Sequence, residues 1–272
     1  MKELEKLLKK YKKISFIPSI EEEKRQMYAY VYATNKLEGN QLTLSQTTQL
    51  LSSDTVSGEK IKTFDILEQK GMYKALSRML KAVRKKEELS IELMLELNWL
   101  TLSYLWRYEE MYFNAKSKGQ KENEFKISDN KIEITRDGKK IDTIIPLSTP
   151  KTAKINMQNL VKIISQSKDK SVVEKAVYLA QEVWLHQPFV DGNKRTGRLL
   201  INFLLMKEGY PLFTFDSEKD NYNSLLVEQY VEHKKGLLIN YIIEKLKAEM
   251  NKSIQSIKKA KKTNKGGFRM ML

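Results

Sequence analysis

The stretch HQPFVDGNKRTGR, from His186 to Arg198, combines an imidazole, a carboxylate, a Gly-Asn pair and three cations in one short segment. Apolar residues at helical spacing precede it, and the almost wholly apolar run LLINFLLM, residues 199–206, follows it. This pattern predicts a loop between two buried helices that ends at the N-terminus of the second helix. Free backbone N–H groups and the positive end of the helix dipole favour a bound phosphate at such a place.

Four side chains of the stretch are candidates for chemistry on a phosphate. Arg195 and Arg198 are three residues apart and therefore share one helix face. Asp191 is a candidate ligand for a divalent cation, because Mg²⁺ prefers one or two carboxylates together with phosphate oxygens. His186 is a candidate base, since imidazole is the side chain that ordinarily titrates near neutral pH. The alternative interpretation is an exposed capping loop with solvated arginines, in which Asn193 caps the helix.

The stretch resembles the signature of the Fic/Doc (Fido) family, HxFx[DE]GN[GK]RxxR. The residues that carry the resemblance are Phe189, Asp191, Gly192, Asn193, Lys194, Arg195 and Arg198. A motif of this length, set between two apolar helices, is specific. The resemblance implies a mainly α fold, with a Fic-like helical core and a small β-hairpin flap.

One residue departs from this signature. The family places its histidine two residues before the phenylalanine, where this chain has Gln187, and His186 lies one residue earlier. Pro188 cannot continue a helix and biases Gln187 toward an extended conformation. We expect a one-residue bulge that restores the imidazole to the site. The alternative is a displaced base and weak or absent activity.

A second motif lies near the N-terminus, where a capping box at Ser19 opens a helix that ends in TNKLEGN, Thr34 to Asn40. A glutamate at the negative end of a helix dipole is unfavourable, so Glu38 needs a partner cation. Within the resemblance, TxxxEGN is similar to the inhibitory motif [ST]xxxE[GN] of Fic proteins. There the glutamate pairs with the last arginine of the signature, here Arg198, and fills the space of the γ-phosphate. The ordinary alternative is a polar residue at a helix end.

The segment KIEITRDGKKIDTII, residues 131–145, carries the strong β signal of the chain. Its isoleucines alternate on both sides of Asp137-Gly138, a hairpin turn dipeptide. An isolated hairpin is marginally stable, so it must pack on the rest of the molecule. The resemblance implies that this hairpin is the flap that binds an extended segment of a target protein by strand addition.

We predict three regions along the chain. Residues 1–89 form an N-terminal helical region with the inhibitory helix, residues 90–245 the Fic-like core, and residues 246–272 a basic C-terminal helix and tail. The stripe of Leu4, Leu7, Leu8 and Tyr11 predicts a short first helix that packs against the body.

Composition restricts the classes of site. The 272 residues include 49 Lys and Arg against 34 Asp and Glu, which gives a net charge of +15. No acidic residue follows Glu249, and seven cations do, so nearly half of the excess lies in the tail and nucleic-acid binding is not favoured. Zero cysteines and two histidines exclude disulfides and multi-histidine metal sites. No apolar run has the length of a membrane span and no secretory signal is evident, so we expect a cytoplasmic protein.

The resemblance implies transfer of a group from ATP to a hydroxyl side chain of a target protein, most often transfer of AMP, which is adenylylation (AMPylation). ATP and Mg²⁺ would be the cofactors. A homo-oligomer is an open alternative to a monomer. In these roles His186 would deprotonate the hydroxyl and Asp191 would hold Mg²⁺. The backbone from Gly192 to Arg195 would form an anion nest that Asn193 orients, and Arg195 and Arg198 would bind the β- and γ-phosphates.

Lys194 stands where the commonest form of the signature has glycine. The Doc branch also has GNKR, and there the lysine favours transfer of the γ-phosphate. A glutamate that obstructs the γ-phosphate fits AMP transfer better, so we expect adenylylation, with phosphate transfer and a catalytically weak regulatory module as alternatives. We expect the Lys194 side chain to point outward into solvent.

Overall fold

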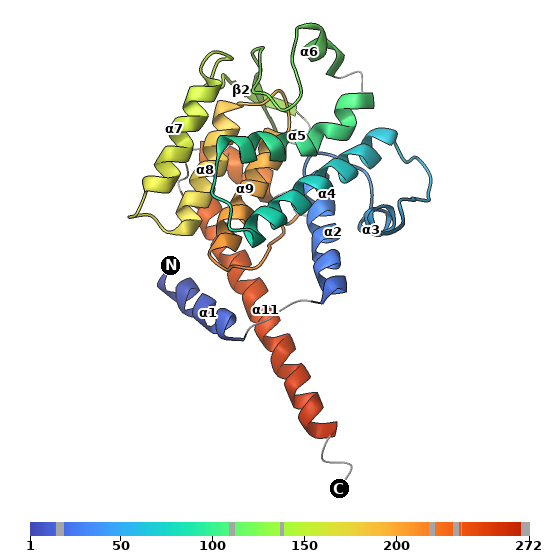
Figure 1. Cartoon of the computed structure of the whole chain (residues 1–272), viewed down its shortest axis with the longest axis vertical. Helices are drawn as coiled ribbons and strands as arrows, with labels where there is room; N and C mark the ends of the chain where they lie inside the picture. Colours follow the sequence, from blue (N-terminus) through green and yellow to red (C-terminus); the bar gives the residue numbers. More distant parts are fainter. Residues whose placement is uncertain are drawn as a thin grey trace.

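Helices α8 (Val172–His186) and α9 (Asn193–Lys207) pack against each other at the centre of the molecule (Figure 1). Helix α8 begins with a reciprocal capping box between Ser171 and Glu174. The loop to α9 turns sharply at Gly192, which takes φ 73°. A Cβ there would lie 3.0 Å from Asn98 Nδ2, so the position favours glycine both by conformation and by space. The predicted loop between two buried helices is confirmed.

The computed structural model describes residues 1–14, 19–108, 112–136, 139–217, 221–230, 234 and 236–267. Within this part, nine further helices surround the central pair. They are α1 (Lys2–Lys13), α2 (Ile20–Lys36), α3 (Leu44–Ser53), α4 (Thr63–Arg84), α5 (Ile91–Tyr108), α6 (Phe113–Ser117), α7 (Ala153–Gln166), α10 (Asn221–Tyr230) and α11 (Leu237–Gly267).

Helices α4 and α5 form a second tightly packed pair that lies against α9. Gly71 allows this, because a Cβ at that position would lie 2.3 Å from the Thr101 carbonyl oxygen on α5. The apolar faces of α4, α5, α8 and α9 share one core, whose fully buried members include Met72, Met94 and Phe203. The start of α9 thereby meets the first half of α4, where Arg195 contacts Glu68.

Strands β1 (Ile132–Arg136) and β2 (Lys139–Ile144) pair as the antiparallel hairpin that the sequence predicted, with Ile132 opposite Ile144. The predicted turn dipeptide Asp137-Gly138 lies outside the described residues. Ile132 and Ile134 are buried in a cluster that includes Trp184 of α8 and Leu226 of α10. The hairpin is therefore anchored on one face by the helical body. A mainly α fold with a small hairpin is confirmed.

The first and last helices of the chain are neighbours, since α1 packs against α11 (Figure 1). Leu4 of α1 is fully buried there, as the predicted docking helix requires. Helix α11 crosses the proposed boundary at residue 245 as one continuous helix and extends away from the body (Figure 1). The division into three regions stays a prediction.

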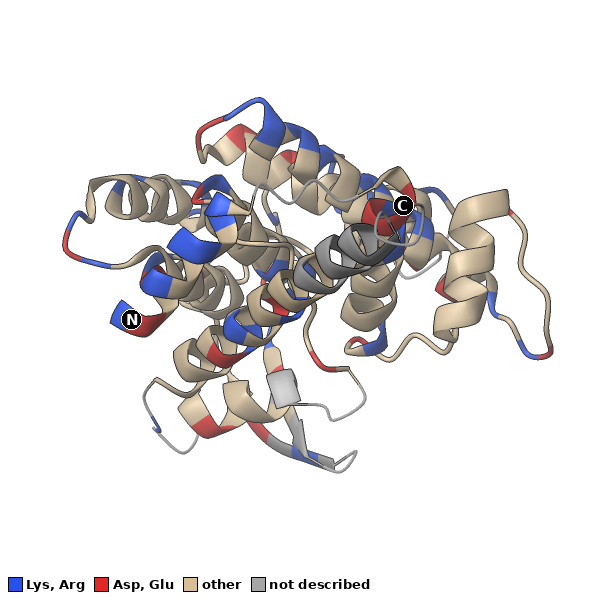
Figure 2. Cartoon of the chain, turned by 90° about the horizontal axis from the view of Figure 1, so that it is seen from below, with Lys and Arg blue, Asp and Glu red and all other residues tan. Residues whose placement is uncertain are grey.

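Lysines and arginines are spread over many of the described helices and loops, with acidic residues among them (Figure 2). None of the described helices has both the length and the apolar character that a membrane crossing needs.

Candidate active site

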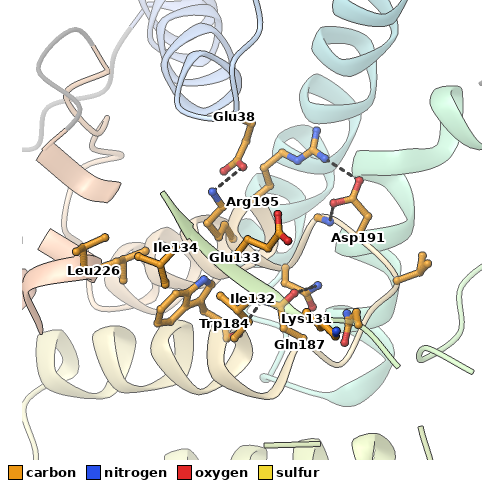
Figure 3. Close-up of a pocket in the computed structure, with 16 residues that line it drawn as sticks. Glu38, Lys131, Ile132, Glu133, Ile134, Trp184, Gln187, Asp191, Arg195 and Leu226 are labelled. Atoms are coloured by element: carbon orange, nitrogen blue, oxygen red, sulfur yellow. Dashed lines mark hydrogen bonds and ion pairs between the residues drawn. The ribbon is translucent and has the colours of Figure 1, made fainter. Parts of the chain in front are cut away.

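A cleft of about 350 Å³ opens beside the N-terminus of α9. Its walls come from the end of α2, strand β1, the end of α8, the loop before α9 and helix α10 (Figure 3). Glu38 reaches into it from the segment after α2, while Asp191 and Arg195 lie on the α9 side (Figure 3). Segments that are far apart in the sequence therefore bring charged groups to one site.

Glu38 lies between two cations of the signature. Its Oε1 accepts a hydrogen bond from Arg198 Nη2 at 2.7 Å, and its Oε2 is 3.0 Å from Lys194 Nζ. Burial alone would raise the pKa of Glu38, but the charges of Lys194 and Arg198 outweigh it and hold the pKa well below its usual range. The carboxylate is therefore ionised at neutral pH.

Thr34, one helical turn before Glu38, binds the same arginine. Arg198 Nε donates to Thr34 Oγ1 at 2.6 Å, and Nη2 donates to the Thr34 carbonyl at 2.9 Å. The Arg198 side chain is fully buried by these contacts. The end of α2 thus covers Arg198, which does not line the cleft in this arrangement.

Arg195 lies between two other carboxylates. Its Nη1 is 2.6 Å from Glu68 Oε1 of α4, and its Nη2 is 3.4 Å from Asp191 Oδ2. Burial would lower the pKa of Arg195, but Asp191 and Glu68 raise it above its ordinary value, so the guanidinium stays charged. Tyr112 OH donates to the same Asp191 oxygen at 2.7 Å.

The loop before α9 is fixed by amide side chains. Asn193 Oδ1 accepts from the Phe189 N–H at 3.1 Å, and its Nδ2 donates to Gln187 Oε1 at 2.9 Å. Asn98 Nδ2 of α5 donates to the Asp191 carbonyl at 2.8 Å. Phe189 is fully buried and stacks on Phe125. A buried ring and two amides therefore set the backbone that carries Asp191.

Comparison with known proteins agrees with this arrangement. Residues 99–205, from α5 to α9, match the Fic/DOC family. The solved structure of a Fic domain containing signaling protein from Bacteroides thetaiotaomicron superposes with a TM-score of 0.76 at 27% identity, over 94% of this chain and 96% of that one. The chain belongs to the Fic/DOC family.

Two further comparisons concern an animal Fic protein. The chain is 27% identical to protein adenylyltransferase fic-1 of Caenorhabditis elegans over 241 residues, which are 85% of this chain and 42% of the relative. The chain thus spans less than half the length of this curated relative. A solved fragment of Fic-1 from C. elegans has the same fold, with a TM-score of 0.73 at 21% identity over 95% and 72% of the two chains.

The histidine of the Fic signature is where the structure differs from our expectation. Helix α8 ends at His186, Gln187 follows in the left-handed conformation at φ 44°, and no bulge brings the imidazole into the cleft. His186 Nδ1 is 2.6 Å from Ser148 Oγ, and Nε2 is 3.4 Å from Glu182 Oε2. Gln187 lines the cleft in its place, with Nε2 bonded to the Trp184 carbonyl at 2.7 Å.

The prediction that Lys194 points into solvent is also wrong. Its ammonium group lines the cleft and binds Glu38, and its side chain is 32% exposed. The physical reason is the attraction of the Glu38 carboxylate, which lies just after α2. The flexible side chain of Lys194 is long enough to bring its ammonium group to this carboxylate.

The structure brings the signature residues and Glu38 together, and their roles stay predictions. Asp191, Gly192, Asn193, Lys194 and Arg195 line the cleft together with Glu38, which contacts the buried Arg198. Three residues that contact Arg195 or Asp191 were not predicted: Glu68, Asn98 and Tyr112. Glu68 had a signal in the sequence, since it falls on the same helix face as Met72 and Ala75 and is therefore a carboxylate within an apolar stripe.

The described part of the chain contains no group of three or more His, Cys, Asp or Glu side chains that would hold a metal ion alone. Asp191 is one carboxylate at the edge of the cleft, with a side chain 38% exposed. Mg²⁺ takes one or two protein carboxylates when phosphate oxygens complete its shell. The residues present therefore fit Mg²⁺ together with a nucleotide, with Asp191 as the protein ligand.

Proposed function

We propose that this chain binds ATP with Mg²⁺ in the cleft and transfers AMP to a hydroxyl side chain of a target protein, and that Glu38 holds the site closed. The observation that carries the proposal is the position of Glu38 between Lys194 and Arg198, at 3.0 and 2.7 Å. The relationship to protein adenylyltransferases supports AMP as the transferred group.

The charges of the site support binding of a polyphosphate after Glu38 has moved. Lys194, Arg195 and Arg198 face Glu38, Glu68 and Asp191, so three cations meet three carboxylates while the site is closed. Removal of Glu38 leaves an excess positive charge and takes away the carboxylate that Lys194 and Arg198 share, so a phosphate would replace it as their partner. The N-terminus of α9 adds free N–H groups from Asn193 onward. Bound Mg²⁺ would neutralise phosphate charge beside Asp191.

In adenylylation the hydroxyl oxygen attacks the α-phosphorus, pyrophosphate leaves, and a base accepts the hydroxyl proton. Asn193 and the buried Phe189 keep the loop rigid, so this chain contributes positioning and charge stabilisation, as phosphoryl transfer requires. In the role that the Fic resemblance implies, His186 accepts the proton, and its imidazole must turn from Ser148 toward the cleft to do so.

A second function, a regulatory nucleotide-binding module with slow transfer, is favoured by Gln187. An amide does not accept a proton at neutral pH, and this amide occupies the cleft while His186 faces away. Nucleotide binding would then be the output of the site, with Glu38 controlling it.

A target segment would bind beside the cleft by strand addition to the hairpin. Ile132 and Glu133 of β1 line the cleft, so a peptide paired with the hairpin would place its side chains next to the phosphates.

The experiment compares three variants given ATP labelled at either the α- or the γ-phosphate, together with a cell lysate. We expect Glu38→Gly to transfer label from the α-position to protein, and Glu38→Gly with His186→Ala to lose it. Label on protein from the γ-position alone would show that the chain transfers phosphate and not AMP. Lys194→Gly should then change which of the two labels appears on protein.

Glu38→Gly with Gln187→His separates the two functions. ATP binding without transfer in Glu38→Gly, together with transfer once Gln187 is histidine, would establish the regulatory module. Unchanged ATP binding in Glu38→Gly would contradict the closing role of Glu38 under both functions.

A further inference from the structure

Glu68 makes the shortest of the ion pairs described at the site, although it lies outside the signature and outside the Glu38 motif. Its Oε1 is 2.6 Å from Arg195 Nη1, and both side chains are almost fully buried, at 4% and 5% exposed. Glu68 reaches Nη1 of Arg195 from α4, whereas Asp191 contacts Nη2. Arg195 thus has one short ion pair with Glu68 and one longer contact, at 3.4 Å, with Asp191.

The other oxygen of Glu68 contacts the segment that carries Glu38. Asn40 Nδ2 donates to Glu68 Oε2 at 2.9 Å, and Asn40 is itself buried. Gln69 Nε2 donates to Asn40 Oδ1 at 3.0 Å and its Oε1 accepts from Asn35 Nδ2 at 3.1 Å. A continuous set of hydrogen bonds therefore runs from the end of α2 through Glu68 to Arg195.

We infer that Glu68 is a positioning residue, which holds Arg195 on the α4 side so that the Asp191 carboxylate stays available for a cation. The inference rests on the proposed function, since the cation is Mg²⁺ brought with the nucleotide. A guanidinium and a metal ion compete for one carboxylate, and the closer the guanidinium lies, the less the carboxylate offers the metal.

Tyr112 holds the same carboxylate from a third direction. Its hydroxyl donates to Asp191 Oδ2 at 2.7 Å, while the Gly192 N–H donates to Oδ1 at 2.5 Å. Because these two hydrogen bonds fix the Asp191 carboxylate, it does not turn toward Arg195. The 3.4 Å distance between Arg195 Nη2 and Asp191 Oδ2 therefore depends on the residue that holds Arg195 in place. Glu68 is the residue that does so.

Loss of the Glu68 charge should draw Arg195 onto Asp191. We expect Glu68→Gln, made in the Glu38→Gly background, to raise the Mg²⁺ concentration that half-saturates nucleotide binding by about 10-fold or more, the usual effect of removing a partner that orients a metal ligand. Glu68→Asp keeps the charge and should restore part of the loss. Calorimetric titration of ATP at a series of Mg²⁺ concentrations measures this.

The matched control is Asp65→Asn, on the same helix one turn earlier. Asp65 is buried, and its Oδ1 accepts from the Gln41 N–H at 3.3 Å, but it does not contact Arg195. It should leave the Mg²⁺ dependence unchanged. An equal change in both variants would mean that loosening of α4 is the cause, and no change in Glu68→Gln would overturn the positioning role.

A readout without nucleotide separates this inference from the proposed function. In the nucleotide-free protein, the arginine side-chain NMR signals of Arg195 should shift in Glu68→Gln and stay in place in Asp65→Asn. Unmoved Arg195 signals would overturn the inference whether or not ATP binds. Failure of Glu38→Gly to bind ATP, with Arg195 signals that do move, would overturn the proposed function alone.

Discussion

Single residues decide how the site responds to pH, and Glu38 is the clearest case. Its pKa lies well below its ordinary value of 4.5, because Lys194 and Arg198 outweigh the effect of burial. A carboxylate with a lowered pKa contributes stability at every pH above its unfolded value, and this contribution is lost only as the pH falls through the lowered pKa. The closed arrangement should therefore persist through mildly acidic pH.

We predict that the ratio of ATP dissociation constants between the native chain and Glu38→Gly is the same, within about twofold, at about pH 7.5 and about pH 5.5. Using a ratio removes the effect of ATP protonation, which is common to both proteins. Isothermal titration calorimetry at the two pH values measures it. A ratio that approaches one at the lower pH would mean that Glu38 becomes protonated there and that burial prevails over the two cations.

At the scale of secondary-structure elements, the distance between α4 and α5 sets the place of Glu68. Gly71 follows Glu68 by one turn, and a Cβ there would lie 2.3 Å from the Thr101 carbonyl oxygen. Backbone atoms do not give way as a flexible side chain does, so the two helices must separate to admit a methyl group. The carboxylate on α4 would move with the helix that carries it.

We predict that Gly71→Ala lowers the free energy of unfolding by about 1–3 kcal/mol through overpacking, in spite of the better helix propensity of alanine. Urea unfolding followed by circular dichroism measures it, with the exposed Lys81→Ala on the same helix as a control expected within about 0.5 kcal/mol of the native chain. Increased stability of Gly71→Ala would show that α4 and α5 separate at little cost.

Over the whole molecule, the sequence was informative where contacts are local. The signature loop, the hairpin and the helix that ends before Glu38 were predicted from spacing and turn residues. The direction of the His186 side chain was not predicted, because it depends on the left-handed backbone of Gln187 and on a hydrogen bond with Ser148. Ser148 lies in the segment between β2 and α7, far from His186 in the sequence. The contacts of Glu68 and Tyr112 likewise depend on how α4 and the residues after α5 pack on α9.

The stability of the whole molecule also reports whether Glu38 closes the nucleotide site, without any transfer reaction. A ligand that binds only the folded state raises the free energy of unfolding by about 2.7 kcal/mol when its concentration is 100 times its dissociation constant. In the native chain, Glu38 occupies Lys194 and Arg198, so part of the binding energy of ATP must be used to displace it. The stabilisation by ATP at a fixed concentration is reduced accordingly.

We therefore predict that saturating Mg²⁺ and ATP raise the melting temperature of Glu38→Gly by roughly 5 °C, since about 1 kcal/mol corresponds to roughly 2 °C for a chain of this length, and that they raise that of the native chain much less. Glu38→Gly with Arg198→Ala should lose the gain, because the two residues act as one unit. Differential scanning fluorimetry over a range of ATP concentrations measures all three proteins. Equal shifts in the native chain and Glu38→Gly would mean that the Glu38 ion pairs leave the nucleotide site open.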